Sequence, residues 1–147
     1  MLKNARGFTL IEALISLVIL SFVSLISFNF VLNLHDYIRL NNVLLVFQAD
    51  LHYARDFNMM QLSDSDSQRM VIRIYHQENR YEILIGDVVK NERELPNNIA
   101  IPHQFVTSDI SFNERGNLGL GRTFVFTSRY HERRVVFSVG AGGFDVR

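Results

Sequence analysis

The longest apolar stretch of the chain lies near its N-terminus. Residues 8–34 are apolar apart from one threonine, one glutamate, four serines and two asparagines. This stretch exceeds the about 20 residues that a helix needs to cross a hydrocarbon core of about 30 Å. Lys3 and Arg6 precede it, whereas the first acid after it is Asp36. By the positive-inside bias we expect a single membrane span, with the N-terminus in the cytoplasm and the C-terminal bulk outside.

Beyond residue 34 the pattern stays helical and becomes amphipathic. Mostly apolar side chains recur at alternating four- and three-residue steps, which places them on one face. They are Leu40, Leu44, Phe47, Leu51, Ala54 and Asn58, whereas Arg39, Asn42, Asp50 and Arg55 are expected on other faces. No proline or glycine interrupts residues 8–62. We predict one helix of about 55 residues, about 80 Å long. Its first half crosses a membrane or lies in a filament core, and its second half, 35–62, packs on a sheet.

The remainder, residues 63–147, alternates between apolar and polar positions as β-strands do. We expect residues 63–68 to be a polar linker. The predicted strands are 70–75, 81–85, a short one at Val88 and Val89, an edge strand or loop at 99–101, a piece around Ile110 and Phe112, and 123–127, 133–139 and 144–146. The predicted fold class is α+β, with the long helix packed on a small, mainly antiparallel sheet that forms a globular head.

Glu12 is the anomaly of the predicted span. An ionised acid in a spanning helix costs about 2.5–3.5 kcal/mol at the centre and less near an end, so such a residue is a functional candidate by default. The alternative is a carboxylate that reaches the headgroups without any role. An ordinary secretory signal peptide is a further alternative, but the apolar run is longer than the usual about 7–15 residues and no A-x-A-like cleavage site follows.

The string Arg6-Gly7-Phe8-Thr9-Leu10-Ile11-Glu12-Ala13-Leu14 resembles the class III leader of type IV pilins and pseudopilins. The resemblance implies that residues 1–7 are a leader and that a prepilin peptidase cuts between Gly7 and Phe8. It also implies that the same enzyme methylates the new N-terminus at Phe8. Glu12 occupies the position of the family's glutamate, which is thought to pair with the α-amino group of a neighbouring subunit during assembly. Before cleavage that amine is an amide and cannot act as the cation.

The head extends the resemblance. Residues 81–87, 110–116 and 139–146 look like the competence minor pseudopilins of Gram-positive bacteria, which are related to minor pseudopilins of type II secretion. Gly143 departs from the arginine that many relatives carry there. The implied partners are the peptidase, other major and minor pilins of the filament, the membrane and, directly or indirectly, DNA. A type II secretion subunit and a membrane-anchored sensor or adhesive domain remain alternatives. Only the sensor or adhesive domain has no need of Gly7 or Glu12.

Composition narrows the chemistry further. The formal net charge is +0, so the chain as a whole lacks the electrostatic signature of a nucleic-acid binder. Without cysteine it has neither a disulfide nor a thiolate metal site, which by resemblance favours a Gram-positive source. The five histidines are scattered, so we expect no enzyme, cofactor or metal centre. Acidic residues in 63–68 lack the glycine and terminal glutamate of an EF-hand loop, and residues 140–143 lack the lysine of a phosphate loop.

One basic group is a candidate for contact with DNA. Arg129, Arg133 and Arg134 cluster near a predicted hairpin turn, beside Tyr130 and His131. Arginine with an aromatic neighbour suits phosphate contact and base stacking. The alternative is a solvated hairpin end.

Overall fold

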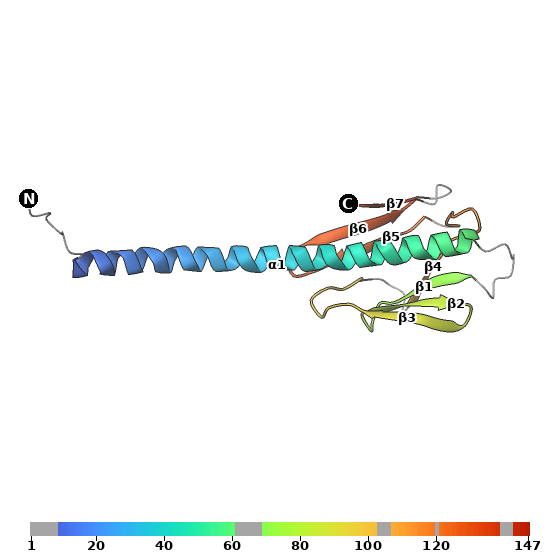
Figure 1. The fold of residues 1–147 in the computed structure, drawn as a ribbon, viewed down its shortest axis with the longest axis horizontal. Helices are drawn as coiled ribbons and strands as arrows, with labels where there is room; N and C mark the ends of the chain where they lie inside the picture. Colours follow the sequence, from blue (N-terminus) through green and yellow to red (C-terminus); the bar gives the residue numbers. More distant parts are fainter. Residues whose placement is uncertain (1–8, 61–68, 103–106, 120, 139–142) are drawn as a thin grey trace, which may run out of the picture. The chain divides into compact units, whose positions relative to one another are not determined.

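The structure is a computed structural model, and it describes residues 9–60, 69–102, 107–119, 121–138 and 143–147. The chain divides into two compact units between His35 and Asp36. The predicted linker at 63–68 and the glycines at 140 and 142 lie outside the described residues. Helix α1, Leu10–Met60, contributes to both units, and the strands all belong to the second (Figure 1).

The first unit holds the apolar part of α1. Within this helix an apolar window long enough to cross a membrane has a mean hydropathy of 2.4, and none of its side chains is buried. The hydroxyls of its four serines each donate to the carbonyl oxygen four residues earlier, at 2.8 Å. Such bonds satisfy polar groups within the helix itself, as a hydrocarbon environment requires. By length and composition, therefore, the helix is suited to a membrane.

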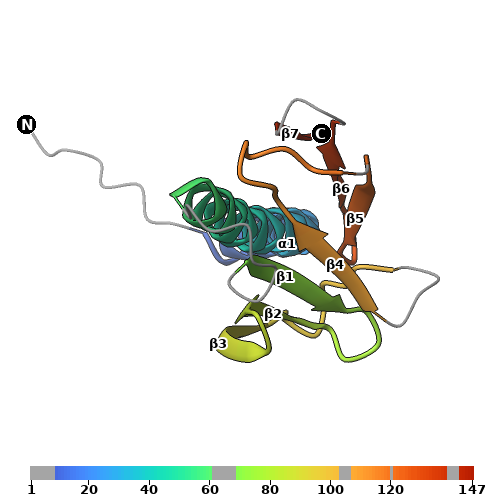
Figure 2. The ribbon, with the colours of Figure 1, turned by 90° about the vertical axis from the view of Figure 1, so that its right-hand side faces the viewer.

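The second unit contains the remainder of α1 and two antiparallel sheets. The four-stranded sheet has the order β3-β2-β1-β4, built from β1 (Met70–Tyr75), β2 (Arg80–Ile85), β3 (Val88–Glu94) and β4 (Thr107–Ser111). The three-stranded sheet has the order β5-β6-β7, built from β5 (Thr123–Thr127), β6 (Glu132–Phe137) and β7 (Phe144–Val146). Figure 2 shows the two sheets on different sides of the helix. The predicted α+β fold class, with its antiparallel head, is confirmed.

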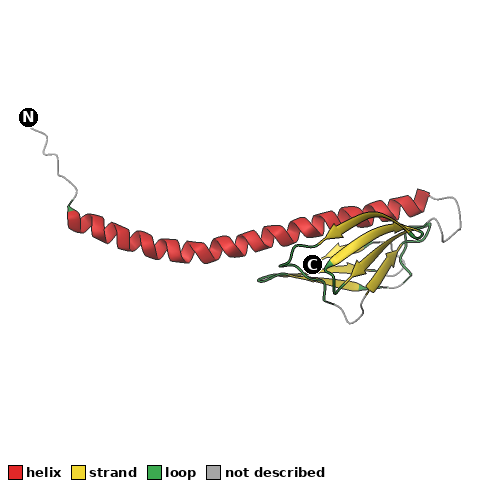
Figure 3. Cartoon of the chain, turned by 90° about the horizontal axis from the view of Figure 1, so that it is seen from below, coloured by secondary structure: helices red, strands yellow, loops and turns green. Residues whose placement is uncertain are grey.

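The core lies where both sheets meet the helix. The predicted helical stripe from Leu40 to Asn58 is buried at every position. Phe47 is central, because its ring contacts Tyr81 of β2 at 5.3 Å between centroids and Phe126 of β5 at 5.1 Å. The strands lie along the last part of α1 in Figure 3. A paired bridge between Ala100 and Thr127, with both N–H···O distances 2.9 Å, connects the segment between β3 and β4 to β5.

The third strand differs from the prediction. We expected a short strand at Val88 and Val89, followed by a polar run, but β3 continues through that run to Glu94. Every residue of β3 is exposed. It lies at the edge of its sheet, so it has no buried face and therefore no alternation of apolar and polar residues to reveal its length. Edge strands of this kind commonly carry charged side chains, which discourage pairing with another chain.

Candidate functional site

The start of α1 is organised by Thr9 and Glu12. The backbone N–H of Glu12 donates to Thr9 Oγ1 at 3.3 Å and to the Thr9 carbonyl oxygen at 3.1 Å, so Thr9 caps the helix. The Glu12 side chain is exposed, and its carboxylate has no hydrogen-bond or ion-pair partner among the described residues. The predicted cleavage residues Gly7 and Phe8 lie outside the described residues. What the structure provides is thus an acid held at a fixed place in the first helical turn, available to an external cation.

Asp36 forms a second site, which the sequence did not single out. Its side chain is only 5% exposed. Asp36 Oδ2 accepts bonds from the Ser128 hydroxyl at 2.6 Å and the Tyr130 N–H at 3.1 Å, and Oδ1 accepts from Asn98 Nδ2 at 3.0 Å. Burial alone would raise the pKa of this carboxyl, but the three donors and His131 outweigh burial and lower the pKa. Asp36 therefore holds the 128–131 loop against the helix as a carboxylate.

The three arginines of the predicted DNA-contact group have different partners in the structure. Arg134 pairs with Glu132 at 2.8 Å on the same strand. Arg133 Nη2 donates to the Tyr37 hydroxyl at 3.3 Å, and its guanidinium lies 5.6 Å from the centroid of the Tyr37 ring. Arg129 lies 5.3 Å from the ring centroid of Tyr130. Arg129 and Arg133 thus contact aromatic rings and pair with no carboxylate among the described residues.

Asp50 corrects a prediction. We placed it away from the packed stripe of the helix, yet it is only 8% exposed. The Tyr81 hydroxyl donates to Asp50 Oδ2 at 2.7 Å, and Arg93 Nε lies 3.4 Å from the same oxygen. Burial, together with the adjacent carboxylate, raises the pKa of Tyr81. The helix tolerates this buried acid because a tyrosine on β2 and an arginine on β3 supply its partners.

Asn58 connects three elements at the end of the helix. Its Nδ2 donates to the carbonyl oxygens of Met70 at 2.9 Å and Phe112 at 3.0 Å, and its Oδ1 accepts from the Met70 N–H at 2.7 Å. The side chain is buried. The predicted stripe included this position without a reason for asparagine, and the reason is that it pairs with strand backbone from β1 and from just beyond β4.

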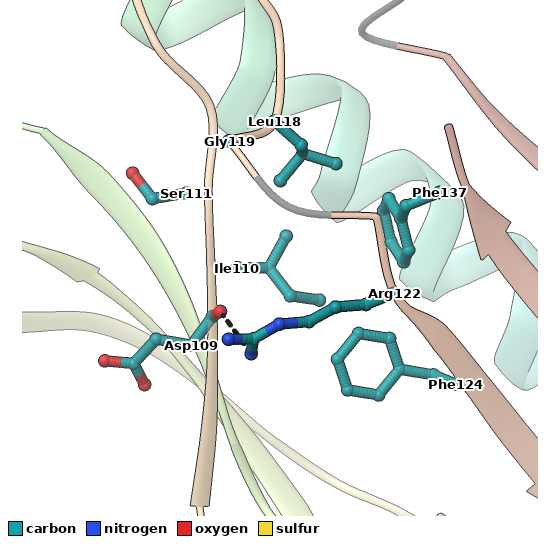
Figure 4. A pocket seen from close by; sticks show the side chains of 8 residues that line it. All are labelled: Asp109, Ile110, Ser111, Leu118, Gly119, Arg122, Phe124 and Phe137. Carbon is teal, nitrogen blue, oxygen red and sulfur yellow. Dashed lines mark hydrogen bonds between the residues drawn. The ribbon is translucent and has the colours of Figure 1, made fainter. Parts of the chain in front are cut away.

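A cleft of about 190 Å³ lies between β4 and the β5–β6 pair (Figure 4). Ile110, Leu118, Phe124 and Phe137 line it with apolar surface. Arg122 crosses it and donates to the Asp109 carbonyl oxygen at 3.3 Å. The Asp109 carboxylate is occupied by Arg73, whose Nε and Nη2 each lie 2.8 Å from one of its oxygens. The cleft therefore offers packing surface, and the described residues that line it form no arrangement of nucleophile, base and acid.

The histidines do not form a metal centre in the described part of the chain, where no group of three or more potential ligands comes together. His76 contacts the Ile101 carbonyl oxygen and the Ser108 hydroxyl, both at 2.9 Å. The ring of His52 lies 4.8 Å from that of Phe144 and the ring of His131 lies 5.4 Å from that of Tyr37, measured between centroids. These three histidines therefore take part in packing and local hydrogen bonds.

Comparison with known proteins gives a match at the N-terminus. Residues 2–28 match the prokaryotic N-terminal methylation motif. No curated protein and no solved structure matches the chain. The match indicates a type IV pilin-like, prepilin-type protein. Such a motif implies processing by a prepilin peptidase and assembly with other pilins, and it fits a membrane-anchored protein assembled at the surface. It points to a structural rather than an enzymatic subunit.

Proposed function

We propose that this chain is a minor subunit of a type IV pilus-like filament that takes up external DNA during transformation. Residues 1–7 serve as the leader, 8–34 as the membrane and filament-core helix, 35–62 as its amphipathic continuation and 63–147 as the head. The peptidase cuts between Gly7 and Phe8 and methylates Phe8. The protein works by assembly and not by turnover.

The observation that carries this proposal is the Glu12 carboxylate in the first turn of an exposed apolar helix, where it has no hydrogen-bond or ion-pair partner among the described residues. A carboxylate and an ammonium group are each costly in lipid, and pairing offsets part of that cost. In the pilins that the leader resembles, the cation for this carboxylate is the mature N-terminal amine of a neighbouring subunit, so each subunit that joins the filament brings one amine and one carboxylate. The free-energy cost of these two charged groups in lipid therefore favours assembly of subunits, in which the groups pair.

The role in DNA uptake rests on the resemblance of three head segments to Gram-positive competence pseudopilins. It is tested by deleting the chain and measuring transformation frequency beside protein secretion by the same cells. Loss of transformation with secretion intact supports the proposal. Loss of secretion with transformation intact supports a secretion-type pseudopilin instead.

The prepilin step is tested on protein extracted from the membranes of its native cell. Intact mass and N-terminal sequencing should give a chain that starts at N-methylated Phe8. Gly7→Ala should insert into the membrane and keep its leader, because the cut requires glycine in this family's motif. A wild-type chain still starting at Met1 would contradict the proposal and favour an anchored sensor or adhesive domain.

Direct DNA contact by Arg129, Arg133 and Arg134 stays a prediction from the sequence. Its test is binding of a duplex oligonucleotide across a salt series. Neutralising phosphate contacts should weaken binding and flatten its salt dependence. The proposed filament role does not require this contact.

A further inference from the structure

The 128–131 loop is held at the point where the chain leaves its apolar run. Asp36, which accepts bonds from the Ser128 hydroxyl and the Tyr130 N–H, is the second residue after Leu34. Tyr37, the next residue, carries Arg133 over its ring. Because these are direct contacts, Arg129, Tyr130 and Arg133 stay within a few side-chain lengths of helix residues 36–37. In a chain whose residues 8–34 span a membrane, this place is the level of the lipid headgroups.

We define the exit cluster as Tyr37, Arg129, Tyr130 and Arg133. Tyr37 is 36% exposed and Tyr130 is 45% exposed, so both rings combine accessible apolar surface with a polar hydroxyl. Of the nearby acids, Asp36 is a buried carboxylate that faces its three donors, and Glu132 is paired with Arg134, so the exposed surface of the cluster carries the charge of the arginines. The exit cluster therefore presents two cations and two amphipathic rings.

We propose that the exit cluster binds the headgroups of anionic phospholipids. Guanidinium groups bind phosphate oxygens through fork-like pairs of N–H donors, and tyrosine is enriched where membrane meets water. Each basic residue near an anionic membrane strengthens binding by about fivefold. Such a contact holds the head against the bilayer before assembly and is released when the subunit leaves the membrane. The inference goes beyond the filament role and requires only that residues 8–34 cross a membrane.

The geometry favours lipid over nucleic acid as the occupant. One face of each tyrosine ring is already covered by an arginine, so the rings are not free stacking platforms for bases. The third arginine, Arg134, is paired with Glu132 and adds little to a phosphate-binding row. The exit cluster also lies directly beside the end of the apolar run, so a bilayer crossed by that run is already adjacent to it, and no other partner has to be brought to the site.

The experiment uses the full, 15N-labelled chain in lipid nanodiscs and requires no paramagnetic tag on the protein. One set of discs is phosphatidylcholine, and another contains about one third phosphatidylglycerol, which supplies the anionic surface. A trace of gadolinium-chelating lipid broadens amide signals near the headgroups, and NMR compares residues 129–133 with residues 113–116. We expect the broadening ratio of these two segments to be severalfold higher in the anionic discs.

Three double variants distinguish binding by the exit cluster from non-specific electrostatic attraction between the head and the anionic bilayer. Arg129→Gln with Arg133→Gln should abolish the difference between the two lipids, whereas Arg129→Lys with Arg133→Lys should retain most of it. Lys90→Gln with Arg122→Gln removes the same charge from exposed positions elsewhere and should leave the difference unchanged. Equal broadening in both lipids, or an equal loss in the Lys90 and Arg122 pair, would overturn the proposal. The proposal would also be overturned if phosphatidylglycerol did not change the broadening ratio while a duplex oligonucleotide bound through Arg129 and Arg133.

Discussion

The hydroxyl of Ser128 lies 2.6 Å from Oδ2 of Asp36, although the two residues are 92 positions apart in the sequence. Ser128 begins the loop between β5 and β6, and Asp36 is the first buried residue of α1. The contact therefore fixes the loop of the three-stranded sheet to the beginning of the packed part of the helix. It depends on Asp36 being ionised, because a carboxylate accepts from all three of its donors.

Asp36→Asn should lower the free energy of unfolding at neutral pH by about 1–3 kcal/mol, because one amide group cannot accept from three donors. Since folding lowers the pKa of Asp36, its stabilisation is complete above the ordinary value of 3.8 and is lost as the pH falls through the lower folded value. The difference between wild type and variant should thus shrink in acid. Denaturant unfolding of the full chain in detergent, at about pH 7 and about pH 3, measures both effects.

Ser128→Ala is the matched control for this pH dependence. It removes one of the three donors, so it should reduce the acid-sensitive difference without eliminating it. A difference between wild type and Asp36→Asn that stays constant from neutral pH to acid would show that the carboxylate charge is not what holds the loop.

Asn58→Ala should destabilise the head more than most single substitutions, by about 3 kcal/mol or more. It leaves the Met70 N–H and the carbonyl groups of Met70 and Phe112 without their side-chain partner in a buried place. Asp56→Ala, on an exposed position of the same helical turn, should change the free energy of unfolding by less than about 0.5 kcal/mol. Similar unfolding midpoints for the two variants would contradict this account of Asn58.

These residues show what the sequence did and did not reveal. The apolar period predicted the helical stripe, and alternation predicted β5 at 123–127 and β7 at 144–146 with the bounds that the structure has. The helical pattern assigns apolar residues to the buried face and charged residues to the exposed face, so it predicted that Asp50 lies outside the core. Its burial depends on Tyr81 and Arg93, whose approach is decided by tertiary structure.

Of the candidate functional residues, too, the sequence revealed one and not the other. Glu12 could be recognised as a candidate from the sequence, because it is an acidic residue within an apolar run and because the leader around it is a short local motif. Asp36 gave no such signal, since its partners at Asn98, Ser128 and Tyr130 come from distant loops. A polar residue at the boundary between an apolar run and an amphipathic helix is the only local sign, and it is also what an ordinary exposed position looks like.

Gly116→Ala should destabilise the head by about 1–3 kcal/mol. Gly116 has a φ of +71°, in the left-handed region, and an added Cβ would lie 2.7 Å from Met59 Sδ and 2.8 Å from Arg55 Nε. Gly119→Ala is the control, because its Cβ would meet nothing within 4 Å, and it should be neutral or slightly stabilising. Thermal unfolding compares the two. If adding Met59→Ala to Gly116→Ala restored full stability, contact rather than backbone conformation would be the whole cause.

Glu12→Gln should leave insertion, cleavage and methylation intact and strongly reduce incorporation into filaments. Thr9 at the cap followed by an acid three residues later is a capping arrangement that glutamine also fits, so this change removes the charge and keeps the start of the helix. Thr9→Ala does the opposite: it weakens the cap by about 0.5–2 kcal/mol and keeps the carboxylate. Intact mass confirms processing of both variants, and the amount of subunit in sheared filaments measures incorporation. Because the proposed role is pairing with an amine, incorporation should follow the charge and not the cap. Normal filament content in Glu12→Gln, or an equal loss in Thr9→Ala, would refute that role.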